Sequence, residues 1–289
     1  MSMKIVNHAY REGEGIPVVL MHAFPVDHRM WDECARSLIQ QADRAGVQPF
    51  AVYAPDMPGS GLSPVPAPEE SGPVAEDGSY PQALDRMTQG YADLLKGLGH
   101  RRAIWVGLSM GGYPAAGMVR LHPDMVAGLA FCDTTADADK PGARDNRLRV
   151  AAQAEREDSV EPVMGFAQAG PSDSTVKRSP EYIERFTGWI RDQSPEGIAW
   201  RQRMAAGRPD QREILASVRV PSAVVSGELD PSSPPAAMQA MVDAMRMSHP
   251  SFTAISDCGH FSAAEQPDRV AAALLDLVRR VAAADAGRH

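Results

Sequence analysis

The most constraining feature of this 289-residue sequence is a serine with glycines two residues before and two residues after it. The stretch reads Gly107-Leu108-Ser109-Met110-Gly111, and the apolar run 103–106 before it predicts a buried strand. Such a strand-to-helix turn holds its serine in a strained backbone conformation, with glycines where side chains would collide. The same pattern also fits a glycine-rich turn with an incidental serine, so the rest of the chain must supply chemical partners.

Composition excludes several classes of protein. The length suits one large α/β domain or a domain with an inserted lobe, and 44% hydrophobic residues suffice for a substantial core. A formal net charge of -8 without a long basic block argues against nucleic acid or an anionic membrane as partners. The three cysteines are far apart in the sequence, and no signal peptide or membrane-length apolar run is evident. We therefore expect a cytoplasmic protein with reduced thiols.

Short apolar runs alternate with amphipathic segments, which predicts a parallel sheet covered by helices. The expected strands are residues 3–7, 17–21, 50–54, 103–106, 126–132, 223–226 and 252–255. The expected helices outside the middle of the chain are residues 31–41, 84–98, about 111–121 and 268–284. Residues 64–82 are rich in proline, glycine, serine and acidic residues, which predicts a mobile surface insertion.

The middle of the chain, residues 136–217, has no strand-like run and reads as helical. Ser179-Pro180-Glu181 and Ser194-Pro195-Glu196 each predict a helix start, with a serine cap and proline at the first position. We therefore expect an α/β core of residues 1–135 and 218–289, with 136–217 as a helical cap. Large apolar side chains of this cap are candidates to line a substrate pocket, although core packing is their commoner role: Phe166, Phe186, Trp189, Trp200 and Met204.

Two more reactive side chains follow predicted strands, where catalytic groups gather in open α/β sheets. Asp230 comes after strand 223–226, and His260 after strand 252–255. A serine hydroxyl needs a base to accept its proton, and imidazole suits that role when a carboxylate fixes its tautomer. The chain order Ser109, Asp230, His260 predicts a catalytic triad. Glu228 is a nearby competitor for the acid, and Asp133 at the end of strand 126–132 is a reserve candidate.

The loop His22-Ala23-Phe24-Pro25 follows an early strand and is expected to supply one backbone donor to an oxyanion hole. Because Pro25 lacks an amide hydrogen, Phe24 is the expected donor, together with the amide of Met110. His22 is expected to hydrogen-bond within its loop, and Asp56 to brace the loop that follows it. No metal-ligand spacing or phosphate-binding glycine loop is evident.

With these motifs the sequence resembles the α/β-hydrolase superfamily across nearly its whole length. The resemblance implies a mostly parallel eight-stranded sheet, a helical cap over the serine and no cofactor. Within the superfamily, the stretches 107–112, 194–198 and 214–221 look most like the 3-oxoadipate enol-lactonases and related esterases. Ala23 departs from the glycine often found at its position, and the insertion 64–82 is not expected in a plain enol-lactonase.

We therefore expect a serine hydrolase acting on a small carboxylic ester or lactone. The alternatives are a 3-oxoadipate-type enol-lactonase, a C–C bond hydrolase, an aminopeptidase or a non-catalytic ligand-binding protein on the same fold. A haloalkane dehalogenase would need a carboxylate in place of Ser109. The pocket is expected to be mainly apolar and to favour an uncharged ester, because basic side chains of the cap usually lie in solvent: Lys177, Arg178, Arg185, Arg191, Arg201, Arg203 and Arg208. The sequence does not predict an oligomeric state.

Overall fold

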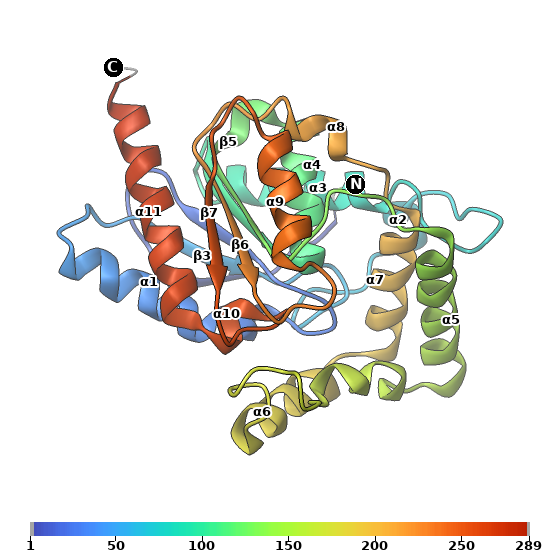
Figure 1. Ribbon diagram of the computed structural model, residues 1–289. Helices are drawn as coiled ribbons and strands as arrows, with labels where there is room; N and C mark the ends of the chain where they lie inside the picture. Colours follow the sequence, from blue (N-terminus) through green and yellow to red (C-terminus); the bar gives the residue numbers. More distant parts are fainter. Residues whose placement is uncertain (1–2, 288–289) are drawn as a thin grey trace.

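A seven-stranded sheet forms the centre of the computed structural model, which describes residues 3–287 (Figure 1). The spatial order is β1-β3-β2-β4-β5-β6-β7; β1 pairs antiparallel with β3, and the other neighbours are parallel. The strands are β1 (Asn7–Arg11), β2 (Val18–Met21), β3 (Val52–Pro55), β4 (Ala103–Leu108), β5 (Val126–Cys132), β6 (Ser222–Gly227) and β7 (Ser251–Ile255). The predicted α/β class is confirmed, with seven described strands where the resemblance implied eight.

Helices cover both faces of the sheet: α1 and α11 pack side by side on one face, and α3, α4 and α9 lie on the other (Figure 1). The α-helices are α1 (Asp32–Arg44), α2 (Pro68–Ser71), α3 (Ala83–Gly97), α4 (Gly112–Leu121), α5 (Pro141–Glu157), α6 (Pro180–Arg191), α7 (Pro195–Gly207), α8 (Arg212–Leu215), α9 (Pro235–Ala244), α10 (Ser262–Glu265) and α11 (Pro267–Ala286). The 3₁₀-helices are η1 (His28–Trp31), η2 (Ser109–Gly111), η3 (Pro123–Met125) and η4 (Glu161–Ala167).

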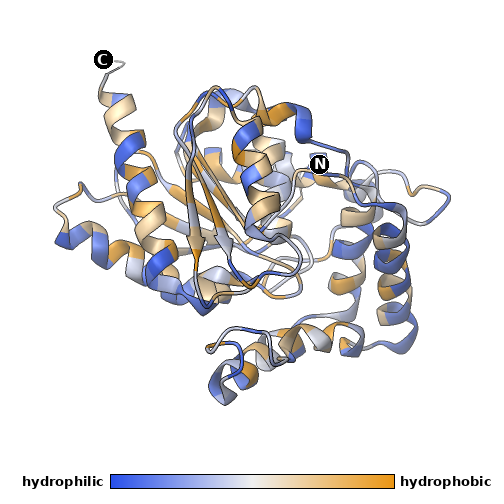
Figure 2. Ribbon diagram, viewed as in Figure 1, coloured by the Kyte–Doolittle hydropathy of each residue, from blue (hydrophilic) through white to orange (hydrophobic). Residues whose placement is uncertain are grey.

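Burial explains why the inner strands were predicted accurately. Every residue of β2, β4 and β5 is buried, as expected for parallel strands covered on both faces, and hydrophobic colour marks the sheet interior (Figure 2). The first strand was predicted at residues 3–7 and lies instead at Asn7–Arg11. It is a half-buried edge strand with an irregularity between Ala9 and Arg11, so its hydrophobic pattern is weak.

The segment 136–217 lies between β5 and β6, and all of it is described. It contains α5 to α8 and η4 and no strand, and we call it the helical insertion. Ser179 and Ser194 cap α6 and α7 through bonds to the amides of Tyr182 and Gly197, as predicted. Helices α5 and α7 pack side by side, away from the sheet (Figure 1).

Residues 64–82 lie at the surface, as predicted, and contact the helical insertion. The segment contains the short helix α2, and Ser71 at its end accepts a 2.8 Å hydrogen bond from the indole of Trp200. The Tyr80 amide donates to the Arg203 carbonyl at 3.1 Å. Among helices of the described residues, none is long and apolar enough to cross a membrane.

Candidate active site

Ser109 stands at the carboxyl end of β4, in a turn that only glycines at both flanks permit. Its φ of 53° lies in the left-handed region, which is strained for a non-glycine residue. A Cβ on Gly107 would lie 2.2 Å from the Gly111 carbonyl oxygen, and one on Gly111 would lie 2.1 Å from the Met21 carbonyl oxygen. Any larger residue would force the turn away from β2 and move the serine hydroxyl.

The structure brings Ser109, His260 and Asp230 into one hydrogen-bonded chain. His260 Nε2 lies 2.7 Å from Ser109 Oγ, and His260 Nδ1 lies 2.8 Å from Asp230 Oδ2. The three residues follow β4, β7 and β6, and their strands end at the same edge of the parallel sheet. The Asp230 side chain is fully buried, and its other oxygen accepts from the Ser232 amide at 2.8 Å. This is the arrangement in which an imidazole can deprotonate a hydroxyl.

The surroundings of His260 favour its protonated form. Burial by itself lowers the pKa of the imidazole, but the hydrogen bond and charge of Asp230, together with the charges of Asp133 and Glu265, outweigh it. The net result is a pKa raised above the ordinary value of 6.5. An imidazole with a raised pKa is a stronger base for the serine proton and is stabilised as the imidazolium that forms.

The two competing acids lie outside this hydrogen-bonded chain. Asp133 is buried at the end of β5, and its Oδ1 accepts from the Gly227 amide at 2.7 Å rather than from His260. Burial, with repulsion from Asp230, raises the pKa of Asp133 to about 7. Glu228 is exposed to solvent. The geometry therefore identifies Asp230 as the acid that bonds the His260 imidazole.

A cavity of about 330 Å³ opens beside the serine. Its lining includes Ser109, His260 and the two expected oxyanion-hole residues, Phe24 and Met110. In the described part of the chain, the Phe24 amide has no backbone or side-chain acceptor, so it is free to bind a ligand oxygen. Buried Phe24 also meets Phe166 edge-on, with 5.8 Å between ring centroids.

Of the five predicted pocket residues, only Phe166 lines this cavity. Phe186 packs against Phe261 at 4.6 Å between ring centroids, and Trp189 lies beneath the Arg185 guanidinium. Trp200 is buried, with its indole bonded to Ser71, and Met204 is buried in the core. The expectation of an apolar pocket built from these four side chains is therefore corrected: they pack the insertion onto the rest of the molecule.

The cavity is instead lined by two arginines, Arg147 and Arg208. Arg208 was expected in solvent but is 3% exposed, and Arg147 on α5 was not singled out from the sequence. Asp139 lies between them, 2.5 Å from Arg147 Nε and 2.7 Å from Arg208 Nη2. The α5 pattern is highly charged on several faces, so no sequence signal identified the face that meets the cavity.

Arg201 on α7 was also expected in solvent, and it is buried instead. Its side chain is completely buried and donates to the Val26 carbonyl at 2.9 Å and to Gln193 Oε1 at 3.1 Å. Its guanidinium lies 5.3 Å from the Phe24 ring centroid. Arg201 thus connects the helical insertion to the loop that carries the Phe24 amide. The other five basic residues of the insertion that were expected in solvent are at least partly exposed.

His22 has the structural role expected for it. The buried ring bonds the Ala23 carbonyl through Nδ1 at 2.8 Å, and Nε2 accepts from the Met57 amide at 2.8 Å. Burial lowers the pKa of His22 to about 4, so the ring is neutral near neutral pH. His22 fixes the loop after β2 to the loop after β3 and does not reach the triad cavity.

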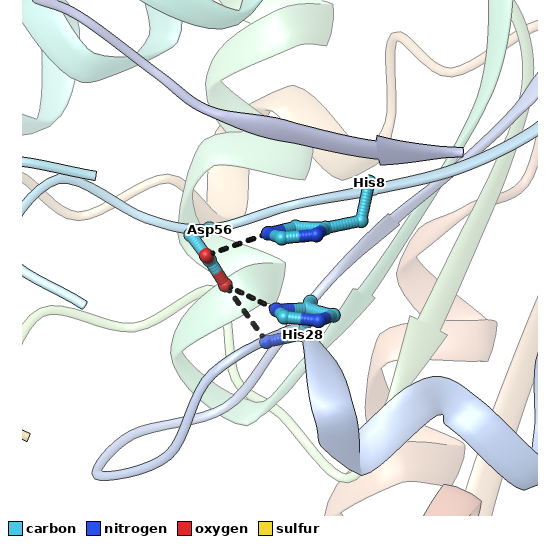
Figure 3. A group of neighbouring side chains, drawn as sticks. All are labelled: His8, His28 and Asp56. Carbon is cyan, nitrogen blue, oxygen red and sulfur yellow. Dashed lines mark hydrogen bonds and ion pairs between the residues drawn. The ribbon is translucent and has the colours of Figure 1, made fainter. Parts of the chain in front are cut away.

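Asp56 braces two loops by accepting from the amides of Leu62 and His28 at 2.9 and 3.0 Å. It also bonds His8 Nε2 at 2.9 Å and His28 Nδ1 at 2.8 Å, and within residues 3–287 these three form the one group close enough to hold a metal ion (Figure 3). The two imidazoles are stacked, with centroids 3.4 Å apart and 9° between their planes. A metal bound by imidazole lies near the ring plane at about 2.0–2.1 Å from nitrogen. One ion cannot lie in two stacked planes, so this arrangement fits hydrogen bonding to Asp56 rather than metal ligation.

A parallel sheet flanked by helices, with a Ser-His-Asp arrangement past its strand ends, defines a hydrolase of the α/β class. The family model of the alpha/beta hydrolase family matches residues 18–273, and the chain belongs to that family. No curated protein sequence matches the chain.

Among solved structures, a thermophilic esterase from Thermogutta terrifontis, with malate bound, is 33% identical. The match covers 96% of this chain and 94% of that one, with a TM-score of 0.81. An enol-lactonase from Burkholderia xenovorans LB400 is 22% identical over 96% of both chains, with a TM-score of 0.74. A hydrolase from Pseudomonas aeruginosa PA01 is 23% identical over 95% of this chain and 94% of that one, with a TM-score of 0.76.

Proposed function

We propose that this protein is a serine hydrolase that cleaves a small carboxylic ester or lactone through an acyl-enzyme. The observation that carries the proposal is the unbroken chain from Ser109 Oγ to His260 Nε2 at 2.7 Å and from His260 Nδ1 to Asp230 at 2.8 Å. This chain borders a cavity large enough for a small ligand. The similarity to an esterase at 33% identity supports the ester bond as the target.

In the proposed reaction, Ser109 Oγ attacks the carbonyl carbon while His260 Nε2 takes the hydroxyl proton. Asp230 holds the Nδ1 proton and stabilises the imidazolium. The amides of Phe24 and Met110 bind the developing oxyanion, an interaction worth about 3 kcal/mol for each donor. His260 then gives its proton to the leaving alkoxide. A water molecule, deprotonated by His260, attacks the acyl group, and His260 returns that proton to Ser109 Oγ as the acid is released.

A fluorophosphonate probe tests the proposal directly, because it labels only an activated serine. We expect labelling of the wild-type protein at Ser109, located by peptide mass spectrometry, and none in Ser109→Ala. The matched control is Ser217→Ala, since Ser217 is exposed and its hydroxyl donates to the Ile214 carbonyl. A folded wild-type protein that neither reacts with the probe nor hydrolyses any carboxylic ester would instead be a non-catalytic binding protein.

A substrate panel separates the alternatives that share this triad. Esters of graded chain length, lactones, peptide amides and a β-diketone report on esterase, lactonase, aminopeptidase and C–C hydrolase activity respectively. We expect kcat/KM to be highest for a small ester or lactone. A cytoplasmic location is part of the proposal and is supported by three buried free cysteines, Cys34, Cys132 and Cys258, which suit a reducing compartment.

A further inference from the structure

We infer that Arg147 and Arg208 form a carboxylate-binding subsite in the cavity beside Ser109, so that the preferred substrate is a small ester or lactone carrying one carboxylate. This inference rests on the proposed function, because it assigns the substrate class of the same site. It replaces the uncharged substrate expected from the sequence.

The first step is the charge of the cavity lining contributed by α5 and by the residues next to α5 and α7. Arg147, Arg208 and Asp139 all line the cavity there. Asp139 pairs with both guanidinium groups, at 2.5 and 2.7 Å, so one carboxylate faces two cations. One positive charge is therefore in excess within this group of three, and a charged donor strengthens a hydrogen bond to a ligand. Asp133, the other acidic residue of the lining, bonds the Gly227 amide and neither arginine.

The second step is the availability of Arg147. Its side chain is 22% exposed, whereas that of Arg208 is 3% exposed. Arg147 Nη2 has one partner among the described side chains, the Tyr113 hydroxyl, at a long 3.4 Å. A ligand carboxylate can displace or supplement this weak contact and accept a charge-assisted bond.

The third step is the pre-organisation of the subsite. The Arg208 guanidinium lies 4.2 Å from the Tyr113 ring centroid and donates to the carbonyls of Asp137 and Ala205. Arg147 Nη1 donates to Gln202 Oε1 at 3.0 Å. Because these contacts hold both guanidinium groups before a ligand arrives, little side-chain ordering is needed on binding.

The fourth step is the position of the subsite relative to the nucleophile. Tyr113 touches both arginines and lies four residues after Ser109. Ser109, Tyr113 and both arginines line the same cavity. The cavity, about 330 Å³, is near the small end of the range for ligand sites. A short substrate can thus place its ester carbonyl at Ser109 and its carboxylate at Arg147, and the single excess charge suits a monoanion better than a phosphate dianion.

The test compares monomethyl adipate with its neutral isostere, the methyl ester of adipamic acid. Their hydrolysis is followed in a pH-stat near neutral pH, where the carboxylate of monomethyl adipate is ionised. The ionic strength is kept low so that salt does not screen the charge. We expect wild-type kcat/KM to favour the charged ester by about tenfold or more, the effect of one charge-assisted hydrogen bond. Arg147→Gln should lower this ratio by about the same factor. The matched control is Arg149→Gln, on the same helix but exposed and outside the cavity, which should leave the ratio unchanged.

Binding to Ser109→Ala, measured by calorimetry, separates this inference from the proposed function. If neither ester is hydrolysed but Ser109→Ala binds monomethyl adipate more tightly than the isostere, the subsite stands and the proposed reaction fails. Equal kcat/KM values for the two esters in the wild type, or a preference unaffected in folded Arg147→Gln, would overturn the subsite while the hydrolase stands. Arg147→Met, which removes the charge but keeps a long side chain, replaces the glutamine variant if that variant does not fold, and the same loss of preference is expected.

Discussion

The Ser174 hydroxyl, in the helical insertion, donates a 2.5 Å hydrogen bond to the buried carboxylate of Glu265. The same carboxylate accepts from the amides of Gly259 at 2.7 Å and Phe261 at 3.1 Å, which flank His260 on both sides. The backbone of the proposed catalytic histidine is therefore held by a side chain that also binds the insertion. This contact couples the placement of the insertion to the alignment of His260.

Glu265→Gln should lower both stability and turnover. A glutamine presents its NH₂ group where one carboxylate oxygen accepts a hydrogen bond, which leaves a buried backbone amide unpaired at a cost of about 1–3 kcal/mol. We expect the free energy of unfolding, measured with urea, to fall by that amount and kcat to fall with little change in KM. Ser174→Ala, which removes only the contact from the insertion, should have a smaller effect on both. An unchanged kcat in folded Glu265→Gln would show that Glu265 does not position His260.

Asp230→Asn should reduce kcat on the order of 10⁴-fold, because an asparagine favours the wrong histidine tautomer. Asp133→Asn should cost much less, since Asp133 bonds the Gly227 amide and not the imidazole. The exposed Glu228, changed to glutamine, is the control for loss of a nearby charge. Steady-state kinetics on one ester compares the three variants. A larger loss in Asp133→Asn than in Asp230→Asn would transfer the role of the acid to Asp133.

Activity should rise with pH through the pKa of His260, because only the neutral imidazole can accept the Ser109 proton. Since that pKa is raised, half-maximal kcat/KM should lie above pH 6.5. The Asp133 carboxylate is one of the charges that raise it, so Asp133→Asn should destabilise the imidazolium and move the profile to lower pH. Asp243→Asn, an exposed change on α9, should leave the profile in place. A shift to higher pH in Asp133→Asn would contradict the electrostatic argument.

The fold and the three triad residues could be predicted from the sequence because each signal is local. Gly107 and Gly111 are required by steric contacts within one turn. Asp230 follows the buried strand β6, and His260 follows the edge strand β7. Strands buried on both faces, such as β4 and β5, are continuous apolar runs. The edge strand β1 lacks such a run, which explains why its position was missed.

The lining of the cavity could not be predicted, because it depends on how two helices of the insertion are rotated. Arg147 and Arg149 are two residues apart on α5, yet one lines the cavity and the other is exposed. Arg201 and Arg203 on α7 are also two residues apart: Arg201 is fully buried, whereas Arg203 is partly exposed and pairs with Glu155. A general preference of arginine for solvent describes Arg149, but it does not predict that Arg201 is buried or that Arg147 lines the cavity.

Zinc should neither stabilise the protein nor be needed for activity. Stacked His8 and His28 rings already bond the Asp56 carboxylate, and their planes cannot share one ion. We expect the melting temperature and kcat to be unchanged by EDTA and by added zinc at equimolar concentration. His8→Gln keeps a side-chain donor toward Asp56 and should give the same insensitivity. A zinc-dependent rise in melting temperature that His8→Gln abolishes would show that the rings rearrange to bind metal.

Arg201→Gln should impair the oxyanion hole from a distance. The guanidinium bonds the Val26 carbonyl and lies over the Phe24 ring, so it fixes the loop that presents the Phe24 amide. A glutamine is too short to keep both contacts, and each buried carbonyl left unpaired costs about 1–3 kcal/mol. We expect lower stability and, because a displaced donor acts mainly on the transition state, a fall in kcat larger than the change in KM. The matched control is Arg203→Gln on the same helix, whose partly exposed pair with Glu155 contributes about 1 kcal/mol or less. If Arg201→Gln loses stability but keeps wild-type kcat at a temperature where it is folded, Arg201 supports the insertion alone and the Phe24 amide is positioned without it.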